Sequence, residues 1–426
     1  MKIVFCTRDS GYLSGGHNTW LAGFLPDLRR REIESRVLCF TLSHREPIPT
    51  VLPLREAGFS FTILSEEEKK YTEERVRWIL ERLAEDPPDV FVSNAVIPAT
   101  YYAGRWLRKA GIPTVAICHG GGMYDRYPGL LDEFVFGRAA YKFSAYVCVS
   151  KYLEQDVLER RPKGILVRRI PCGVSIPKDV AKKPNGRLRL AYFGQLVEER
   201  KRVSELTYAL CRAVREVPGT EALIYGDGPA TPAVEKIIRE NGDGLPVRLV
   251  GKVDKDQVQR HLLECHAVVL LSDHEGLGLA LVEGMACGVV PIGLRGAPGV
   301  TEFVRDDVTG ILAADRGDDF VAAVRRLRQD QLLWERLACS ARAHVETEYS
   351  EETCAARWQE LFHKLVTSSG PRKPLRIPRR LHLPPVHPTL AVMDTRVLRP
   401  HQRLIGRARR FVNRVKNDCL SIFGPQ

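Results

Sequence analysis

The chain has 426 residues, 44% of them hydrophobic and 27% charged, a balance typical of a folded protein and more than one ordinary core accommodates. No apolar run approaches the roughly 18 residues of a membrane-spanning helix, and the opening MKIVFCTRDS meets charge too soon for a signal peptide. The eleven cysteines form no CxxC pair and no metal-ligand spacing. We therefore expect two or three domains in a reducing cytoplasm.

The formal net charge of +12 is concentrated at the C-terminus. Residues 371–426 contain thirteen Lys and Arg residues against two acids, Asp394 and Asp418, so the other 370 residues carry a net charge of only +1. The basic character belongs to a tail, and the body of the protein has no charge excess typical of nucleic-acid binding.

In the first half of the chain, short apolar runs alternate with amphipathic stretches. The runs lie at 2–6, 35–40, 59–64, 89–93, 114–118 and 145–150. Helical patterns separate some of them, for example at 71–86 and 98–111. Continuous apolar strands that alternate with helices are typical of a parallel sheet covered on both faces.

A stretch rich in Pro, Gly and Lys near 174–186 interrupts this pattern, which then restarts. New apolar runs lie at 188–194, 220–229, 247–253, 266–273, 288–294 and 309–314. A helical pattern over 317–367 is expected to close this second half. We predict an α/β protein of two facing, Rossmann-like, doubly wound domains at 1–173 and 187–349, with a linker at 174–186 and a closing helix at 350–369. Ligands of such sheets bind at the carboxyl ends of the strands.

The basic tail at 370–426 begins with a Pro/Arg-rich segment, which predicts an extended and poorly packed chain. Residues 400–416 then fit a helix with one apolar and one basic face. Such a helix fits an anionic membrane surface, which would make the protein peripheral to the inner face of the cell membrane. Docking on the protein's own surface is the alternative. Nucleic acid is a poor fit, because few aromatic residues accompany the basic ones.

The stretch HEGLGLALVEGMACG at 274–288 carries two carboxylates, Glu275 and Glu283, with Gly276 and Gly278 between them. Two glycines disfavour a helix interior and two charges disfavour a buried strand, so we expect a loop that leads into a short helix ended by Gly288. Such a junction is suited to phosphate binding. Stabilisation of two carboxylates by the helix dipole alone is the alternative explanation.

Other strand ends carry further candidate residues. Lys201 follows Gly194 in FGQLVEERKRV, and cations near a helix N-terminus are unfavourable unless an anion binds there. His119 precedes a glycine run in AICHGGG, where a structural and a ligand-binding role are about equally supported. Asp254 and Asp256 look like a metal-binding D-x-D, but a helix cap and a first-turn acid explain them.

Taken in order, eight segments resemble the retaining glycosyltransferases of family 4, also called glycosyl transferases group 1, over about residues 1–367. The segments are SGGHNTWLAGFL, ICHGGG, YVCVSKYLEQDV, RRIPCGVSIP, YFGQLVEERKRVSEL, IYGDGP, LVGKV and the stretch from DHEGLGLALVEG to VTGIL. The resemblance implies a GT-B fold and a nucleotide-diphosphate sugar as co-substrate, with no other cofactor and no metal. It implies transfer of the sugar to a hydroxyl of a glycan or lipid-linked acceptor with retention of configuration.

The same resemblance assigns roles to particular residues. Glu283 would bind the ribose of the donor and Glu275 its sugar, while His119 would contact the transferring sugar. Gly278 and Leu279 would offer backbone amides to the sugar and diphosphate, and Lys201 would neutralise the leaving diphosphate. Gly16 would lie against the diphosphate from the first domain.

One residue departs from the family pattern. Gln195 stands where the family usually has an arginine, so it would contribute a hydrogen bond to the diphosphate but no charge, unless Arg200 or Arg202 compensates. Two other functions stay open at this point. One is a nucleotide-sugar epimerase, and the other is an inactive scaffold of the same fold that acts through its basic tail.

Overall fold

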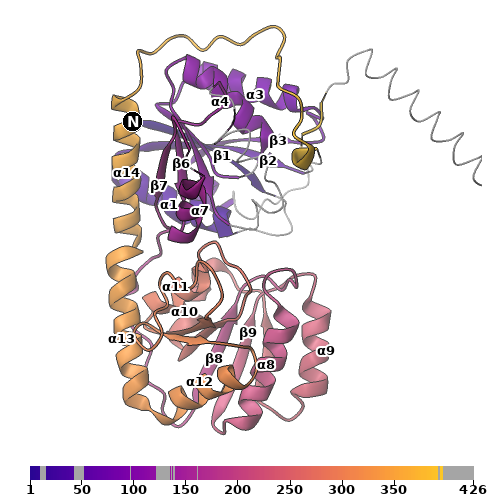
Figure 1. Ribbon diagram of the computed structural model, residues 1–426, viewed down its shortest axis with the longest axis vertical. Helices are drawn as coiled ribbons and strands as arrows, with labels where there is room; N and C mark the ends of the chain where they lie inside the picture. Colours follow the sequence, from indigo (N-terminus) through magenta and orange to yellow (C-terminus); the bar gives the residue numbers. More distant parts are fainter. Residues whose placement is uncertain are drawn as a thin grey trace, which may run out of the picture.

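The computed structural model describes residues 1–9, 16–42, 52–95, 97–120, 140–160, 162–391 and 394–396, together with the single residues 135 and 137. Two α/β domains lie one above the other along the long axis of the molecule (Figure 1). Among the described residues, no helix combines the length and apolar character that crossing a membrane requires.

The first domain is built on a parallel sheet of seven strands in the order β3-β2-β1-β4-β5-β6-β7. The strands are β1 Lys2–Asp9, β2 Glu34–Thr41, β3 Ser60–Ser65, β4 Val90–Ser93, β5 Thr114–Cys118, β6 Ala145–Cys148 and β7 Leu166–Arg169. The helices are α1 Gly16–Arg30, α2 Leu52–Glu56, α3 Thr72–Glu85, α4 Pro98–Lys109 and α7 Lys151–Glu159. Helices lie on both faces of the sheet, which explains why β4, β5 and β6 are buried along their whole length.

The second domain is built on a parallel sheet of six strands in the order β10-β9-β8-β11-β12-β13. The strands are β8 Leu188–Phe193, β9 Thr220–Tyr225, β10 Val247–Gly251, β11 Ala267–Leu270, β12 Val290–Leu294 and β13 Ile311–Ala313. The helices are α8 Val203–Glu216, α9 Thr231–Asn241, α10 Lys255–Leu263, α11 Leu279–Ala286, α12 Asp318–Gln329 and α13 Gln331–Glu348. The predicted pair of doubly wound α/β domains is confirmed.

Both sheets reverse their strand order at one point. The first sheet reverses between β1 and β4, and the second between β8 and β11. Loops that leave neighbouring strands at such a point diverge to opposite faces and open a crevice. The residues after β8 and β11 are therefore placed around one crevice of the second domain.

The last helix, α14 at Glu351–Thr367, packs on the first domain, although the helical pattern at 317–367 predicted that it would close the second half. Ser350 caps α14 by accepting from the Thr353 amide, and α13 and α14 form a column along one side of both domains (Figure 1). Trp358 of α14 lies 6.1 Å from Trp20 of α1, ring centre to ring centre. The amphipathic pattern predicted the helix but not which domain it would cover.

The tail, described at 370–391 and 394–396, is extended over its Pro/Arg-rich part, as predicted, and most of residues 371–388 are exposed or partly exposed, whereas Leu390 and Asp394 are buried. It leaves α14, crosses the first domain beyond α4 and α3 and descends beside β3 (Figure 1), with a short 3-10 turn at Pro388–Leu390. Leu390 is fully buried, and the Asp394 carboxylate accepts a hydrogen bond of 2.9 Å from the Tyr102 hydroxyl. The predicted helix at 400–416 lies outside the described residues.

Candidate functional site

Lys201 and Glu275 meet in the crevice of the second domain. Lys201 lies in the turns between β8 and α8, and Glu275 lies in the loop after β11. The Lys201 ammonium is 2.6 Å from Glu275 Oε1, and the two side chains are 22% and 11% exposed. Two residues that are 74 positions apart in the sequence are therefore joined as one ion pair at the predicted donor site.

Two different constraints require glycine at positions 276 and 278. A Cβ at Gly276 would overlap the carbonyl oxygen of His119 and lie 3.0 Å from the Gly120 Cα, both in the first domain. Gly278 has φ of +77° and precedes the first residue of α11, a backbone conformation that favours glycine. The first glycine thus permits close contact between the domains, and the second permits the turn into the helix.

The predicted loop and short helix are present, and Gly288 follows the helix with φ of +74°. Leu279 is the first helical residue, and the first amides of a helix have no partner within it. They can therefore donate to a phosphate. Glu283 was expected near the helix start, but it lies in the second turn, so interaction with the helix dipole does not account for it.

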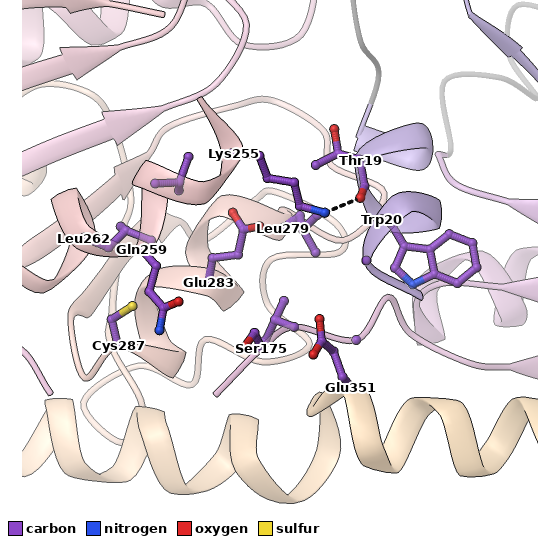
Figure 2. Close-up of a pocket in the computed structure, with 14 residues that line it drawn as sticks. Thr19, Trp20, Ser175, Lys255, Gln259, Leu262, Leu279, Glu283, Cys287 and Glu351 are labelled. Atoms are coloured by element: carbon purple, nitrogen blue, oxygen red, sulfur yellow. Dashed lines mark hydrogen bonds between the residues drawn. The ribbon is translucent and has the colours of Figure 1, made fainter. Parts of the chain in front are cut away.

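Glu283 lines a small cavity of about 110 Å³ between the two domains (Figure 2). Residues of α1, α10 and α11, the chain at 173–175 and Glu351 complete the lining. Burial raises the pKa of the Glu283 carboxyl from 4.5 to about 7, and the nearby Lys255 ammonium opposes this rise. A carboxylate in such a cavity can accept hydrogen bonds from a diol such as that of a ribose.

Lys255 is a member of this cavity that the sequence reasoning missed. Its ammonium group donates a hydrogen bond of 2.6 Å to the Thr19 carbonyl of α1, across the domain boundary (Figure 2). Removal of the ammonium group from water lowers the pKa of Lys255, while Glu283 and Glu351 oppose this change. Its neighbour Asp254 occupies the N-cap position of α10, as predicted, but its side chain makes no capping hydrogen bond.

A signal for Lys255 was present in the sequence. Lys255 is the first residue of α10, and a cation at that end of a helix opposes the helix dipole. The same argument identified Lys201. Only the two aspartates of the D-x-D pattern, Asp254 and Asp256, were considered as ligands, and the lysine between them was not.

His119 lies at the domain boundary, and its backbone contacts the Glu275 loop. Its Nε2 lies 2.9 Å from Asn94 Oδ1, and its ring lies 5.5 Å from that of Trp20, centre to centre. Burial and the neighbouring His17 hold the pKa of His119 well below its usual value. The imidazole is therefore neutral at pH 7. Because Asn94 Oδ1 can only accept a hydrogen bond, the ring proton is assigned to Nε2, which donates to it.

The remaining predicted residues surround the same crevice. The Gln195 carbonyl accepts a hydrogen bond of 2.9 Å from the Tyr192 hydroxyl, so the backbone of this residue is fixed. Arg202 is engaged by Glu205 and Asp273, whereas the Arg200 guanidinium lies beside Gly120, 3.7 Å from where a Cβ of Gly120 would be. Arg200 thus lies at the domain boundary, whereas the Arg202 guanidinium is held by two carboxylates.

Gly16 begins α1 and is exposed, with open space where a Cβ would be. Within the described part of the chain, no group of three or more His, Cys, Asp or Glu residues is arranged to hold a metal ion. The expected independence of metal stays a prediction.

Comparisons with protein families match both domains. The family model for "Glycosyltransferase Family 4" matches residues 14–177, and the one for "Glycosyl transferases group 1" matches residues 187–330. A lipopolysaccharide core biosynthesis glycosyltransferase of Rhizobium meliloti is 34% identical over 157 residues, which cover 36% of this chain and 45% of that protein. The chain thus spans less than half the length of the first curated relatives that it matches.

Other relatives and solved structures match over longer ranges. A GDP-mannose-dependent phosphatidylinositol dimannoside mannosyltransferase of Mycobacterium tuberculosis is 26% identical over 303 residues, which cover 62% of this chain and 74% of that protein. The structure of Anabaena HepE in complex with UDP and glucose superposes with a TM-score of 0.67 at 17% identity, covering 85% of this chain and all of HepE. That likeness shows the GT-B fold. With a family match in each of its two domains, the chain belongs to the group 1 glycosyltransferases.

Proposed function

We propose that this protein transfers a sugar from a nucleotide-diphosphate donor to an acceptor hydroxyl, with retention of the anomeric configuration and without a metal ion. The observation that carries the proposal is the Lys201–Glu275 ion pair, which lies at the strand-order reversal of the second sheet. The same loop contacts His119 of the first domain. An epimerase would need a pair of base residues in the crevice, which the sequence does not offer.

The proposed chemistry needs no enzyme nucleophile. The bond between the anomeric carbon and the diphosphate breaks, and the acceptor oxygen bonds to that carbon on the same face. The acceptor proton passes to a leaving diphosphate oxygen. Lys201 and the first amides of α11 stabilise the negative charge that develops on the diphosphate, while Glu275 binds sugar hydroxyls and Glu283 the ribose.

The relatives support this donor and acceptor class. HepE has been observed with UDP-glucose, and the mycobacterial relative is named as GDP-mannose-dependent. The rhizobial relative acts in lipopolysaccharide core synthesis and the mycobacterial one on a phosphatidylinositol dimannoside. We accordingly propose a glycan or lipid-linked acceptor, and attachment to an anionic membrane through residues 400–416.

Calorimetric titration with UDP, GDP, ADP and dTDP tests the donor site. We expect micromolar binding of one diphosphate, and a loss of at least tenfold in affinity in Glu283→Ala, because a buried diol would lose its hydrogen-bond partner. Glu240→Ala, at an exposed position on α9, is the matched control and should bind as the wild type does. Failure of the wild type to bind any of the four would favour the inactive-scaffold alternative.

A further inference from the structure

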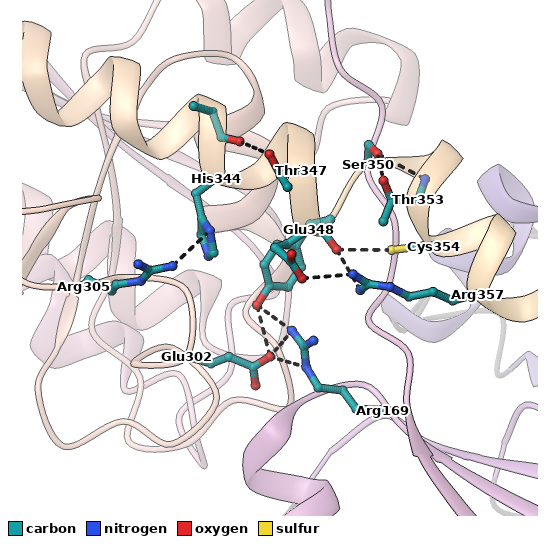
Figure 3. Close-up of polar contacts among 12 residues, drawn as sticks. Arg169, Glu302, Arg305, His344, Thr347, Glu348, Ser350, Thr353, Cys354 and Arg357 are labelled. Atoms are coloured by element: carbon teal, nitrogen blue, oxygen red, sulfur yellow. Dashed lines mark hydrogen bonds and ion pairs between the residues drawn. The ribbon is translucent and has the colours of Figure 1, made fainter.

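Glu302 of the second domain joins the two domains through a buried ion cluster (Figure 3). Its side chain is 4% exposed. Its Oε1 accepts hydrogen bonds of 2.5 Å from Arg169 Nε and 3.1 Å from the Tyr349 hydroxyl. Arg169 ends β7 of the first domain, and it also donates to the Tyr349 hydroxyl at 2.9 Å.

The second carboxylate oxygen of Glu302 contacts the first domain at another point. Oε2 accepts from the backbone amide of Lys151, which is the first residue of α7. A carboxylate at the N-terminus of a helix is stabilised by the free amides and by the helix dipole. Glu302 therefore holds two elements of the first domain, β7 and α7, with one side chain.

The segment that carries Glu302 also supports the loop of the proposed sugar site. The Glu275 amide donates to the Pro298 carbonyl at 3.3 Å. Gly299, with φ of +84°, lies so close to Glu275 that a Cβ would overlap the Glu275 carbonyl oxygen. Phe303 lies against Gly278, with its ring 3.5 Å from where a Cβ of Gly278 would be. The turn at 298–303 is thus packed against the loop at 275–278.

We propose that Glu302 is a positioning residue that fixes the turn at 298–303, and with it Glu275, relative to the first domain. The sugar would be held by Glu275 of the second domain and attacked by an acceptor bound on the first. A displacement of about 1 Å between such groups can reduce a rate about 100-fold. Glu283, Lys201 and the first amides of α11, which would bind the ribose and the diphosphate, all belong to the second domain, so the inference expects diphosphate binding to survive a change in the domain contact. The catalytic part of this inference rests on the proposed function.

The test compares full-length wild type, Glu302→Gln and the control Asp307→Asn. Asp307 also carries an ion pair, to Arg326 at 2.7 Å, but this pair is about half exposed and lies within the second domain. We expect Glu302→Gln to show a larger radius of gyration in small-angle scattering, because one contact between the domains is lost. We also expect a 10- to 100-fold lower kcat for release of nucleoside diphosphate from the donor, with KM and the diphosphate Kd within about threefold of the wild type.

A wild-type kcat and radius of gyration in Glu302→Gln would overturn the inference. So would equal losses of kcat and diphosphate affinity, together with a melting temperature far below that of Asp307→Asn, because these indicate general destabilisation. Arg169→Met should reproduce the effect, and the double variant should be no worse than either single one if the pair acts as a unit. If the wild type binds no diphosphate and uses no donor, the proposed function fails. The radius of gyration of Glu302→Gln then tests the domain contact by itself, and a radius equal to that of the wild type would refute the inference.

Discussion

The ionisation of Glu283 depends on the cavity around it. Burial raises the pKa of this carboxyl to about 7, whereas Lys255 lowers it. Within the native protein, the carboxylate is therefore harder to form than in an exposed glutamate. The pKa of Glu283 therefore lies close to neutral pH, well above that of an exposed glutamate.

This pKa predicts a pH dependence of stability. A native pKa above the unfolded value of about 4.5 means that the native state binds more protons between the two values. The stability contributed by the protonated group is complete below about pH 4.5 and is lost as the pH rises through 7. Glu283→Gln removes this titration. Between pH 5 and pH 8 the wild type should therefore lose up to about 3 kcal/mol of stability that Glu283→Gln keeps. The melting temperature of Glu283→Gln should accordingly exceed that of the wild type by more at pH 8 than at pH 5.

Differential scanning fluorimetry at both pH values measures this effect. Glu240→Gln, at an exposed position on the same domain, should follow the wild type throughout. Parallel pH profiles for Glu283→Gln and the wild type would mean that burial does not shift the pKa of Glu283.

Among the elements, the tail, described at 370–391 and 394–396, contacts the first domain at several points. The Asp394 carboxylate is bonded to Tyr102 and to Arg396 at 2.5 Å, and the Thr72 amide at the start of α3 donates to the Thr395 carbonyl at 2.7 Å. Arg372 donates to the Pro88 carbonyl at 2.8 Å. A strongly basic, Pro-rich composition therefore does not prevent packing here, because individual side chains find partners on the domain surface.

This packing predicts different effects for two truncations. A chain that ends at Ser369 loses the buried Leu390 and the Asp394–Tyr102 hydrogen bond, and a buried leucine alone contributes about 2 kcal/mol. We expect its melting temperature to fall by about 4 °C or more. A chain that ends at Arg396 keeps these contacts, so its melting temperature should equal that of the full-length protein.

The same three chains test attachment to a membrane. Flotation with anionic liposomes should be strong for the full-length protein and weak for both truncated chains, because each lacks residues 400–416. Equal flotation of the full-length chain and the chain that ends at Arg396 would contradict attachment through that segment. The shorter truncation alone could not decide this, because it also disturbs the first domain.

On the scale of the whole molecule, the two domains are in contact at the proposed site. Gly276 of the second domain touches the backbone at His119 and Gly120 of the first, with no room for a Cβ. Both obstacles are backbone atoms, so a methyl group cannot be accommodated by rotation of a side chain. An alanine at this position must separate the domains or displace the loop that carries Glu275.

We therefore expect Gly276→Ala to reduce kcat at least tenfold, with a larger radius of gyration and a melting temperature close to that of the wild type, because opening of the cleft relieves the clash. Gly296→Ala is the matched control, since a Cβ there would meet open space. Steady-state kinetics and small-angle scattering of both variants provide the measurement. Full activity in Gly276→Ala would show that this contact is not needed for catalysis.

The sequence alone predicted the fold class and the loop at 274–288 because both depend on local patterns. The alternation of apolar strands with amphipathic helices predicts a parallel α/β architecture, and it does not depend on knowing which strands pair. Glycines with two carboxylates specify a turn into a helix. β7 was missed because LVRR is a short edge strand, in which only Val167 is buried.

Only the tertiary structure decided which distant residues meet. Contacts such as Lys201 with Glu275, Lys255 with Thr19, and Trp358 with Trp20 join positions 74, 236 and 338 residues apart. Hydrophobic periodicity gives the buried face of each element but not its partner, so α14 was assigned to the wrong domain, and the burial of Leu390 and Asp394 was not predicted. The raised pKa of Glu283 also has no local cause, because burial by several elements produces it. The sequence by itself determined the elements and the candidate residues, and packing between the two domains determined how those residues are brought together.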